Sequence, residues 1–390
     1  MNRISKKAIA ALLVISLILP GCLSDEVSEI SEMEDCQDDS SCEITDSIVE
    51  EEAIEEVISI SENNFCDNTN PDHCLLPFPS SAFLSSDSTS LTGFRVNIPG
   101  EAIPDSASAV SNEFHMINSR DGHSPSSQIF TTFRSLPNIS SLASQDNIAP
   151  SIANGHGSVL LNMDSGEIVE HWVEISSRTQ EGEATLVHIR SLRGLEHNTQ
   201  YAVAFRGLID SDGAEVEPFD AFMALREEIS TDSDQIENAR PGYETMFSAL
   251  SEVGFERASL QSAWWFHTAS SQSLTENIIS MRNDAILRLG DGGIGCNVTS
   301  VDEDYGGDNS TLRRISGTIT TPHYLESTYP PTPMTRDEDG KPKFNFLSEV
   351  VFTLAIPMSA AENSQPVPLV VLGHGFLGNG EGMVSGFRAW

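Results

Sequence analysis

Basic residues are scarce in this sequence. Its 390 residues include 21 Lys and Arg against 58 Asp and Glu, which gives a formal net charge of −37 at pH 7. Apart from Lys6 and Lys7, the only lysines are Lys341 and Lys343. Phosphate binding needs clustered Lys and Arg, so the composition argues against a nucleic-acid partner. An acidic excess fits an extracellular protein in a salty medium, where counter-ions screen self-repulsion.

The N-terminal apolar run is too short to cross a membrane. It covers residues 8–19 and follows Arg3, Lys6 and Lys7, whereas a spanning helix needs about 20 apolar residues. A basic start before a short apolar run predicts a secretory signal peptide. Leu19-Pro20-Gly21-Cys22 also resembles a lipobox, which implies that residues 1–21 are a lipoprotein signal peptide and that Cys22 is lipidated. The protein is then expected outside the cytoplasm, anchored to the cell membrane. The alternative is an ordinary secretory signal with a chance cysteine.

An acidic segment follows. Residues 25–62 contain no Lys or Arg, and the first basic residue after Lys7 is Arg95. Such a segment buries too little apolar surface to offset its ordering entropy. We expect residues 22–64 to be a disordered acidic tether.

The cysteines predict disulfides and no metal centre. With Cys22 lipidated, the local pairs Cys36/Cys42 and Cys66/Cys74 are favoured, because each would close a short polar loop and leave Cys296 over, but the pairing stays open. No C-x-x-C motif occurs, so zinc and redox motifs are unsupported. No metal and no cofactor is expected.

Residues 65–232 are typical of a β-rich, sandwich-like domain, because short apolar runs alternate with turn signals. Residues 159–163 and 167–175 are expected to pair as a hairpin, and residues 184–189 and 201–209 to form further strands. Asp210-Ser-Asp-Gly213 is expected to be a turn. Calcium binding at Asp210 and Asp212 is the weaker interpretation, since the later ligands of a calcium loop are out of register.

Residues 233–292 are predicted to be a helical segment. The apolar period changes to about 3.6 over residues 240–290. Pro241 suits a first helical position, Gly254 an end, and Ser273-Leu-Thr-Glu276 a capping box for a second helix that ends before Gly290. The cluster Trp264-Trp265-Phe266-His267 between the helices could be a ligand surface, but core packing is the expectation.

In residues 293–390 the sequence pattern changes again, from a helical one to that of a linker followed by strands. A linker is expected over residues 291–312, strands over 314–321 and 349–357, and a buried apolar strand over 367–372. The last strand runs into His374-Gly375-Phe376-Leu377-Gly378. A Gly-containing turn after a central strand can aim a backbone N–H at a developing oxyanion.

This strand and turn resemble the oxyanion turn of α/β-hydrolase lipases and esterases. The resemblance implies that the backbone N–H of Phe376 is an oxyanion donor, that Gly375 shapes the turn, and that His374 supports it structurally. Residues 293–390 are then expected to be the start of an α/β-hydrolase domain that is truncated. The predicted fold is therefore a β-rich domain plus a helical segment, followed by the first strands of that hydrolase domain.

Short segments earlier in the chain resemble the N-terminal region of large secreted bacterial lipases of the virulence-factor type. They are Leu75-Leu-Pro-Phe-Pro-Ser80, Arg95-Val-Asn-Ile-Pro99, Asn118-Ser-Arg-Asp-Gly122, Arg206-Gly-Leu-Ile-Asp-Ser-Asp-Gly213 and Trp265-Phe-His-Thr-Ala269. The resemblance implies an ester or lipid substrate and a Ser-Asp/Glu-His triad after residue 390.

A nucleophile within the sequence is not expected. No G-x-S-x-G motif occurs. Ser385 has no strand before it, and His156 does not follow a buried strand. The sequence thus predicts the N-terminal part of a lipid-anchored serine hydrolase, a fragment inactive by itself. The alternative is a non-catalytic, surface-anchored β-sandwich lipoprotein with a binding role. The oligomeric state stays open.

Overall fold

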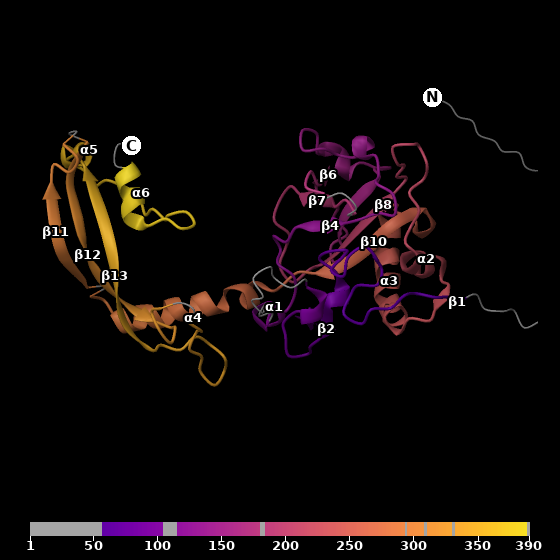
Figure 1. Ribbon diagram of the computed structural model, residues 1–390, viewed down its shortest axis with the longest axis horizontal. Helices are drawn as coiled ribbons and strands as arrows, with labels where there is room; N and C mark the ends of the chain where they lie inside the picture. Colours follow the sequence, from indigo (N-terminus) through magenta and orange to yellow (C-terminus); the bar gives the residue numbers. More distant parts are fainter. Residues whose placement is uncertain are drawn as a thin grey trace, which may run out of the picture. The chain divides into compact units, whose positions relative to one another are not determined.

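The computed structural model describes residues 57–103, 115–179, 184–292, 295–307, 310–329 and 332–387. These residues form 13 strands in several small sheets and 6 α-helices (Figure 1). This content of strands and helices confirms the prediction of a β-rich chain with helical parts. Cys22, Cys36 and Cys42 lie outside the described residues, as does the predicted signal peptide.

The central sheet is antiparallel, with β8 (Gln200–Arg206) between β5 (Ser158–Asn162) and β10 (Leu260–His267). Side chains alternate between the two faces of a strand, and both faces of β8 are covered. Its larger side chains contribute to one hydrophobic core and its alanines to another: Tyr201, Val203 and Phe205 against Ala202 and Ala204. This sheet is therefore the middle of three layers.

A second antiparallel sheet packs on the first face. Its order is β4 (Ile129–Thr131), β7 (Val187–Ser191) and β6 (His171–Ile175). Apolar side chains of both sheets share one core, as expected for a sandwich. Trp264 and Phe266 of β10 are fully buried there, which confirms core packing for most of the predicted aromatic cluster.

Two helices, α2 (Asp220–Glu227) and α3 (Asp234–Glu252), cover the other face of the central sheet (Figure 1). The predicted start of α3 at Pro241 is wrong, because the Ser233 side chain accepts a hydrogen bond from Ile236 N–H and caps the helix earlier. Pro241 lies inside it. The predicted end is confirmed, with Gly254 at φ +81° just beyond.

Residues 233–292, predicted to be a helical segment with an aromatic cluster between two helices, also hold a strand that was not expected. They contain β10, an apolar run buried on both faces, where periodicity does not separate strand from helix. The second helix, α4 (Ser271–Leu289), is capped by Ser270, whose side chain accepts from Ser273 N–H at 3.0 Å. The capping box at Ser273 was thus placed three residues late. Gly290, at φ +59°, follows the helix as predicted.

Short elements complete this part of the molecule. The bounds of the remaining 3₁₀ and short α-helices are Ser81–Phe83, Gly100–Ala102, Ile139–Ser141, Ala149–Ile152, Arg257–Ser259 and, for α1, His115–Asn118. β2 (Leu84–Ser86) pairs with β3 (Phe94–Val96) beside a small core of Phe83, Val96, Ile98 and Ala102.

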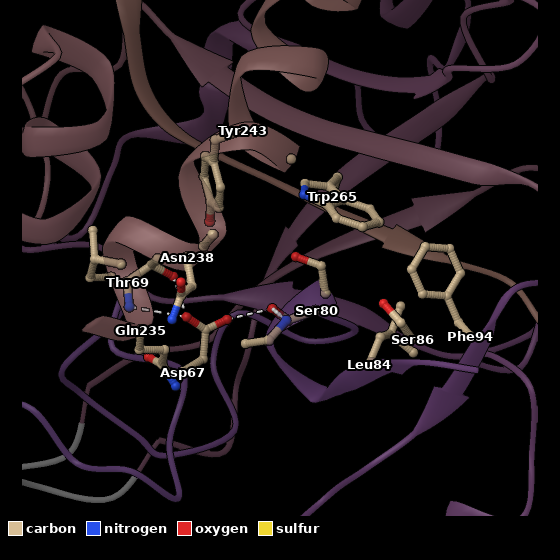
Figure 2. Close-up of a pocket in the computed structure, with 15 residues that line it drawn as sticks. Asp67, Thr69, Ser80, Leu84, Ser86, Phe94, Gln235, Asn238, Tyr243 and Trp265 are labelled. Carbon is tan, nitrogen blue, oxygen red and sulfur yellow. Dashed lines mark hydrogen bonds between the residues drawn. The ribbon is translucent and has the colours of Figure 1, made fainter. Parts of the chain in front are cut away.

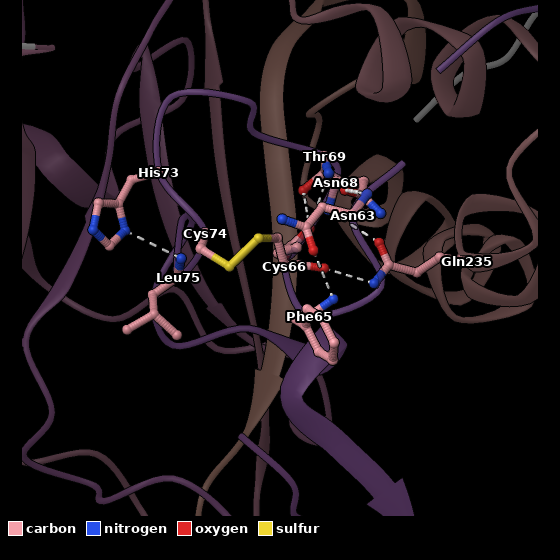
Figure 3. Close-up of a disulfide and its surroundings, with 10 residues drawn as sticks. Asn63, Phe65, Cys66, Asn68, Thr69, His73, Cys74, Leu75 and Gln235 are labelled. Carbon is pink, nitrogen blue, oxygen red and sulfur yellow. Dashed lines mark hydrogen bonds between the residues drawn. A yellow bond between two sulfur atoms is a disulfide. The ribbon is translucent and has the colours of Figure 1, made fainter. Parts of the chain in front are cut away.

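The predicted end of the tether, residue 64, is too late in the chain. β1 (Val57–Ile58) pairs in parallel with β9 (Ser230–Thr231), so the segment from residue 57 to residue 64 belongs to the folded part. The expected Cys66–Cys74 disulfide is present (Figure 3), and Cys296 is exposed with a free thiol.

The predicted hairpin over residues 159–175 is correct only near its turn. Leu161 and Ile168 form a bridge around Gly166, which has φ +73°. Beyond that bridge the chain leaves the central sheet and enters the second sheet as β6. The turn at residues 210–213 is confirmed, since the Asp210 carboxylate accepts from the backbone N–H groups of Asp212 and Ala214.

The C-terminal described residues form a separate antiparallel sheet of β11 (Cys296–Glu303), β12 (Thr311–His323) and β13 (Phe346–Pro357). The strands predicted at 314–321 and 349–357 are confirmed. The linker predicted over residues 291–312 is wrong, because β11 lies within it and completes seven Cα pairings with β12 despite its polar sequence.

The predicted buried strand at residues 367–372 is also wrong in this structure. The run forms no strand, and most of its side chains are exposed, with Val371 at 87%. It pairs with none of the described strands, so its apolar sequence alone does not produce a strand. Two short helices flank this region, α5 (Met358–Ala361) and α6 (Gly380–Phe387). No described helix is both long and apolar enough to cross a membrane.

Candidate functional site

The predicted oxyanion turn is a closed backbone turn in front of α6. Gly378 N–H donates to the Gly375 carbonyl at 2.9 Å. Leu377 has φ +63°, a left-handed conformation that few side chains adopt. Asn379 then receives a hydrogen bond from Gly382 N–H on its side chain at 2.7 Å and begins the helix. The sequence therefore folds locally into a turn and a helix, without the buried strand expected before them.

His374 supports this turn. Its Nδ1 lies 2.9 Å from the Gly375 carbonyl oxygen, and a carbonyl only accepts, so Nδ1 is the donor. A Cβ at Gly378 would approach the Gly375 oxygen at 3.0 Å and the His374 Cβ at 3.2 Å. The tight packing at Gly378 and the imidazole contact hold one turn geometry.

Phe376 presents a backbone donor to the surroundings. Within the described residues, the N–H groups of Phe376 and Leu377 have no acceptor. The Phe376 side chain is 98% exposed. The structure thus brings His374, Gly375 and Phe376 into one turn with an N–H free to bind an oxygen.

Ser385 lies within α6. A nucleophile elbow places its serine on a sharp turn between a strand and a helix, whereas the position of Ser385 inside a helix does not provide one. Cys22, the predicted lipidation site, lies outside the described residues.

A buried Ser–His pair in the leading domain, by which we mean residues 57–270, was not predicted from the sequence. Ser158 Oγ lies 2.9 Å from His171 Nε2, and His171 Nδ1 lies 2.8 Å from the Val169 carbonyl. Burial lowers the pKa of His171 to about 4, with nearby His156 acting in the same direction. Ser158 and His171 are buried, so this pair joins strands and does not meet a substrate. No sequence motif marks it.

A cavity of about 310 Å³ lies between the segment around Asp67 and helix α3 (Figure 2). The Asp67 carboxylate accepts hydrogen bonds from Ser80 Oγ and from Thr69, with Thr69 Oγ1 at 2.6 Å. Burial raises the pKa of the Asp67 carboxyl, and these hydrogen bonds oppose that change. Burial also raises the pKa of Tyr243. Sequence reasoning did not find this cavity, because its walls come from segments far apart in the chain.

Metal binding has no candidate in the described part of the chain, where no three His, Cys, Asp or Glu side chains gather in a way that could hold an ion. Comparisons of the chain with protein-family models, with curated proteins and with solved structures find no match. Function must therefore be argued from the residues and their geometry.

Proposed function

We propose that this chain is the leading part of a lipid-anchored, extracytoplasmic serine hydrolase that cleaves carboxylic esters, with lipids as the substrate class. The observation that carries the proposal is the closed turn at residues 374–378 and its available Phe376 N–H. Acyl transfer builds negative charge on the substrate carbonyl oxygen, and preorganised backbone donors stabilise that charge.

The residues of the turn have separate roles in this proposal. Phe376 N–H donates to the oxyanion of the tetrahedral intermediate. Gly375 leaves the approach to that N–H open, since a Cβ there would meet nothing within 4 Å in the described structure. His374 holds the turn through its bond to the Gly375 carbonyl and is not the general base. The second oxyanion donor comes from another part of the enzyme.

The nucleophile of the proposed reaction is a serine in sequence that follows Trp390, since the 390 residues contain no G-x-S-x-G motif. An acid and a histidine base follow it in chain order and complete the triad. The serine attacks the ester carbonyl, the alcohol leaves, and water hydrolyses the acyl-enzyme. Lipidation of Cys22 would hold the enzyme at a surface rich in ester substrates.

The test uses the protein encoded by the whole reading frame. It should hydrolyse p-nitrophenyl esters and become labelled by a fluorophosphonate, which reacts with activated serines. Gly375→Val should block the approach to Phe376 N–H. It should lower kcat about 100-fold or more, because loss of one oxyanion donor costs about 2.7 to 4 kcal/mol. Phe376→Ala should retain most activity, because it keeps the backbone N–H.

Two results would contradict the proposal. One is a whole-frame protein that neither turns over esters nor reacts with the fluorophosphonate. The other is an equal loss of activity in Gly375→Val and Phe376→Ala, which would remove Phe376 N–H from the oxyanion site. The 390-residue chain by itself should give neither turnover nor labelling.

A further inference from the structure

The cavity beside Asp67 has a rigid frame. The Cys66–Cys74 disulfide closes the loop next to Asp67 (Figure 3). Gln235 of α3 ties this loop to the helix, because its Nε2 donates to the Cys66 carbonyl at 2.7 Å and its Oε1 accepts from Asn68 N–H at 3.0 Å. The cavity volume is therefore fixed before any ligand arrives.

The far wall of the cavity is aromatic. Phe94 and Trp265 meet edge to face, with ring centroids 6.1 Å apart. Gly242 of α3 lies against the indole, since a Cβ there would be 2.9 Å from Trp265 Nε1. Figure 2 shows Trp265 between Tyr243 of α3 and Phe94, with Phe94 beside Ser86. A flat ring could pack against this wall.

Several polar groups on the cavity lining are unused. Within the described residues, the side chains of Asn238, Ser81 and Ser86 and the Trp265 indole N–H make no hydrogen bond. Together they offer both donors and acceptors. A ligand that carries several hydroxyl groups could satisfy them at once.

The charge of the lining narrows the ligand class. Among the described residues that line the cavity there is no Lys, Arg or His, so an anion would find no countercharge there. Asp67, the one carboxylate among the described lining residues, already accepts from Thr69 N–H, Thr69 Oγ1 and Ser80 Oγ on its two oxygens. Because those oxygens are engaged, the carboxylate is a poor partner for a cationic ligand.

We propose that this cavity binds an uncharged, polyhydroxylated ligand of about one sugar ring. Its volume of about 310 Å³ lies at the small end of ligand pockets, which span about 300 to 1,000 Å³. The C–H face of a sugar ring packs against the aromatic wall, and its hydroxyls bond Asn238 and the serines. This site belongs to the leading domain and is independent of the ester chemistry proposed above.

The experiment titrates the full chain by calorimetry with glucose, galactose, mannose and N-acetylglucosamine. Choline serves as a cationic probe and acetate as an anionic one. At least one sugar should bind with a Kd of about 1 mM or tighter. Asn238→Ala should weaken that binding about fivefold, the effect of one neutral hydrogen bond. Ser86→Leu should abolish it by filling the space next to Phe94.

Ser248→Ala is the matched control, because Ser248 is exposed on the same helix and does not line the cavity. It should leave sugar binding unchanged, and all three variants should keep the unfolding midpoint of the parent. Absence of binding by every sugar would overturn the proposal. So would sugar binding that Ser86→Leu does not affect, or choline binding without any sugar binding.

Discussion

Burial sets the protonation of single residues in the leading domain. His123 and His171 are buried, and burial lowers the pKa of each to about 4. His123 Nε2 lies 3.0 Å from the Ser80 carbonyl, so the ring is held as a neutral donor. The unfolded chain restores an ordinary histidine pKa near 6.5.

This difference makes folding sensitive to mild acid. Between pH 6.5 and 4 the unfolded state binds more protons than the folded state, so stability is lost as the pH falls through that window. Each buried histidine should contribute a loss of about 2 kcal/mol between pH 7 and pH 5. Urea unfolding at the two pH values measures the loss.

His171→Gln removes one of these groups and should reduce the loss by about 2 kcal/mol. His73→Gln, at an exposed position, is the control and should change the loss little. An unchanged pH dependence in His171→Gln would show that His171 is not the neutral, buried group that the structure describes.

At the scale of elements, a single glycine determines how closely the C-terminal strands approach. Gly317 of β12 pairs with Val298 on one side and Phe352 on the other. A Cβ at Gly317 would lie 2.3 Å from the Asn297 carbonyl oxygen and 2.8 Å from the Phe352 ring. The backbone oxygen cannot give way without distorting the ladder.

Gly317→Ala should therefore destabilise this sheet by about 1 to 3 kcal/mol, the usual cost of forced overpacking. Hydrogen exchange of the β12 amides would report the change. Gly295→Ala is the control, because a Cβ at Gly295 meets nothing within 4 Å. Equal exchange rates in the parent and Gly317→Ala would mean that β11 lies farther from β12 than described.

Elements with local signals were predictable from the sequence. Helix ends at Gly254 and Gly290 and the turn at Asp210 depend on residues next to them. β10 was not predictable, because a run buried on both faces has no period that separates it from a helix. β11 was missed because its side chains are all exposed, and only its backbone pairing with β12 makes it a strand.

The two candidate sites also differ in whether the sequence alone could predict them. His374, Gly375 and Phe376 are neighbours in sequence, so a motif was enough to bring them together. Asp67 and Trp265 are nearly two hundred positions apart in the numbering, and only the packing of α3 on the central sheet places them around one cavity. Pairwise proximity of this kind is a property of the fold and leaves no local pattern.

For the whole molecule, the dominant property is its negative charge. The formal net charge is −37. The described ion pairs are arginine–carboxylate contacts in which at least one partner is about a third or more exposed, and such pairs contribute little each. Self-repulsion among the remaining carboxylates opposes the compact state.

Stability should therefore rise with salt. The screening length falls from about 30 Å at 0.01 M to about 3 Å at 1 M, so the thermal midpoint should increase steadily over that range of NaCl. KCl should act like NaCl, because screening depends on ionic strength alone. A midpoint that falls with salt would show that the arginine ion pairs outweigh the repulsion.

The β1–β9 pair also determines how tension on the chain would reach the folded body. Only Val57 and Ile58 pair there. The next bonds along the chain, toward the folded body, are those of Ser59 and Ile60 to the Asp232 carboxylate and of Glu62 to Ser233. Of these residues, Ile60 alone packs against a hydrophobic core. A pull applied from the N-terminal side should break these few contacts before it loads any of the three layers, so the core of the domain should stay intact until they are broken.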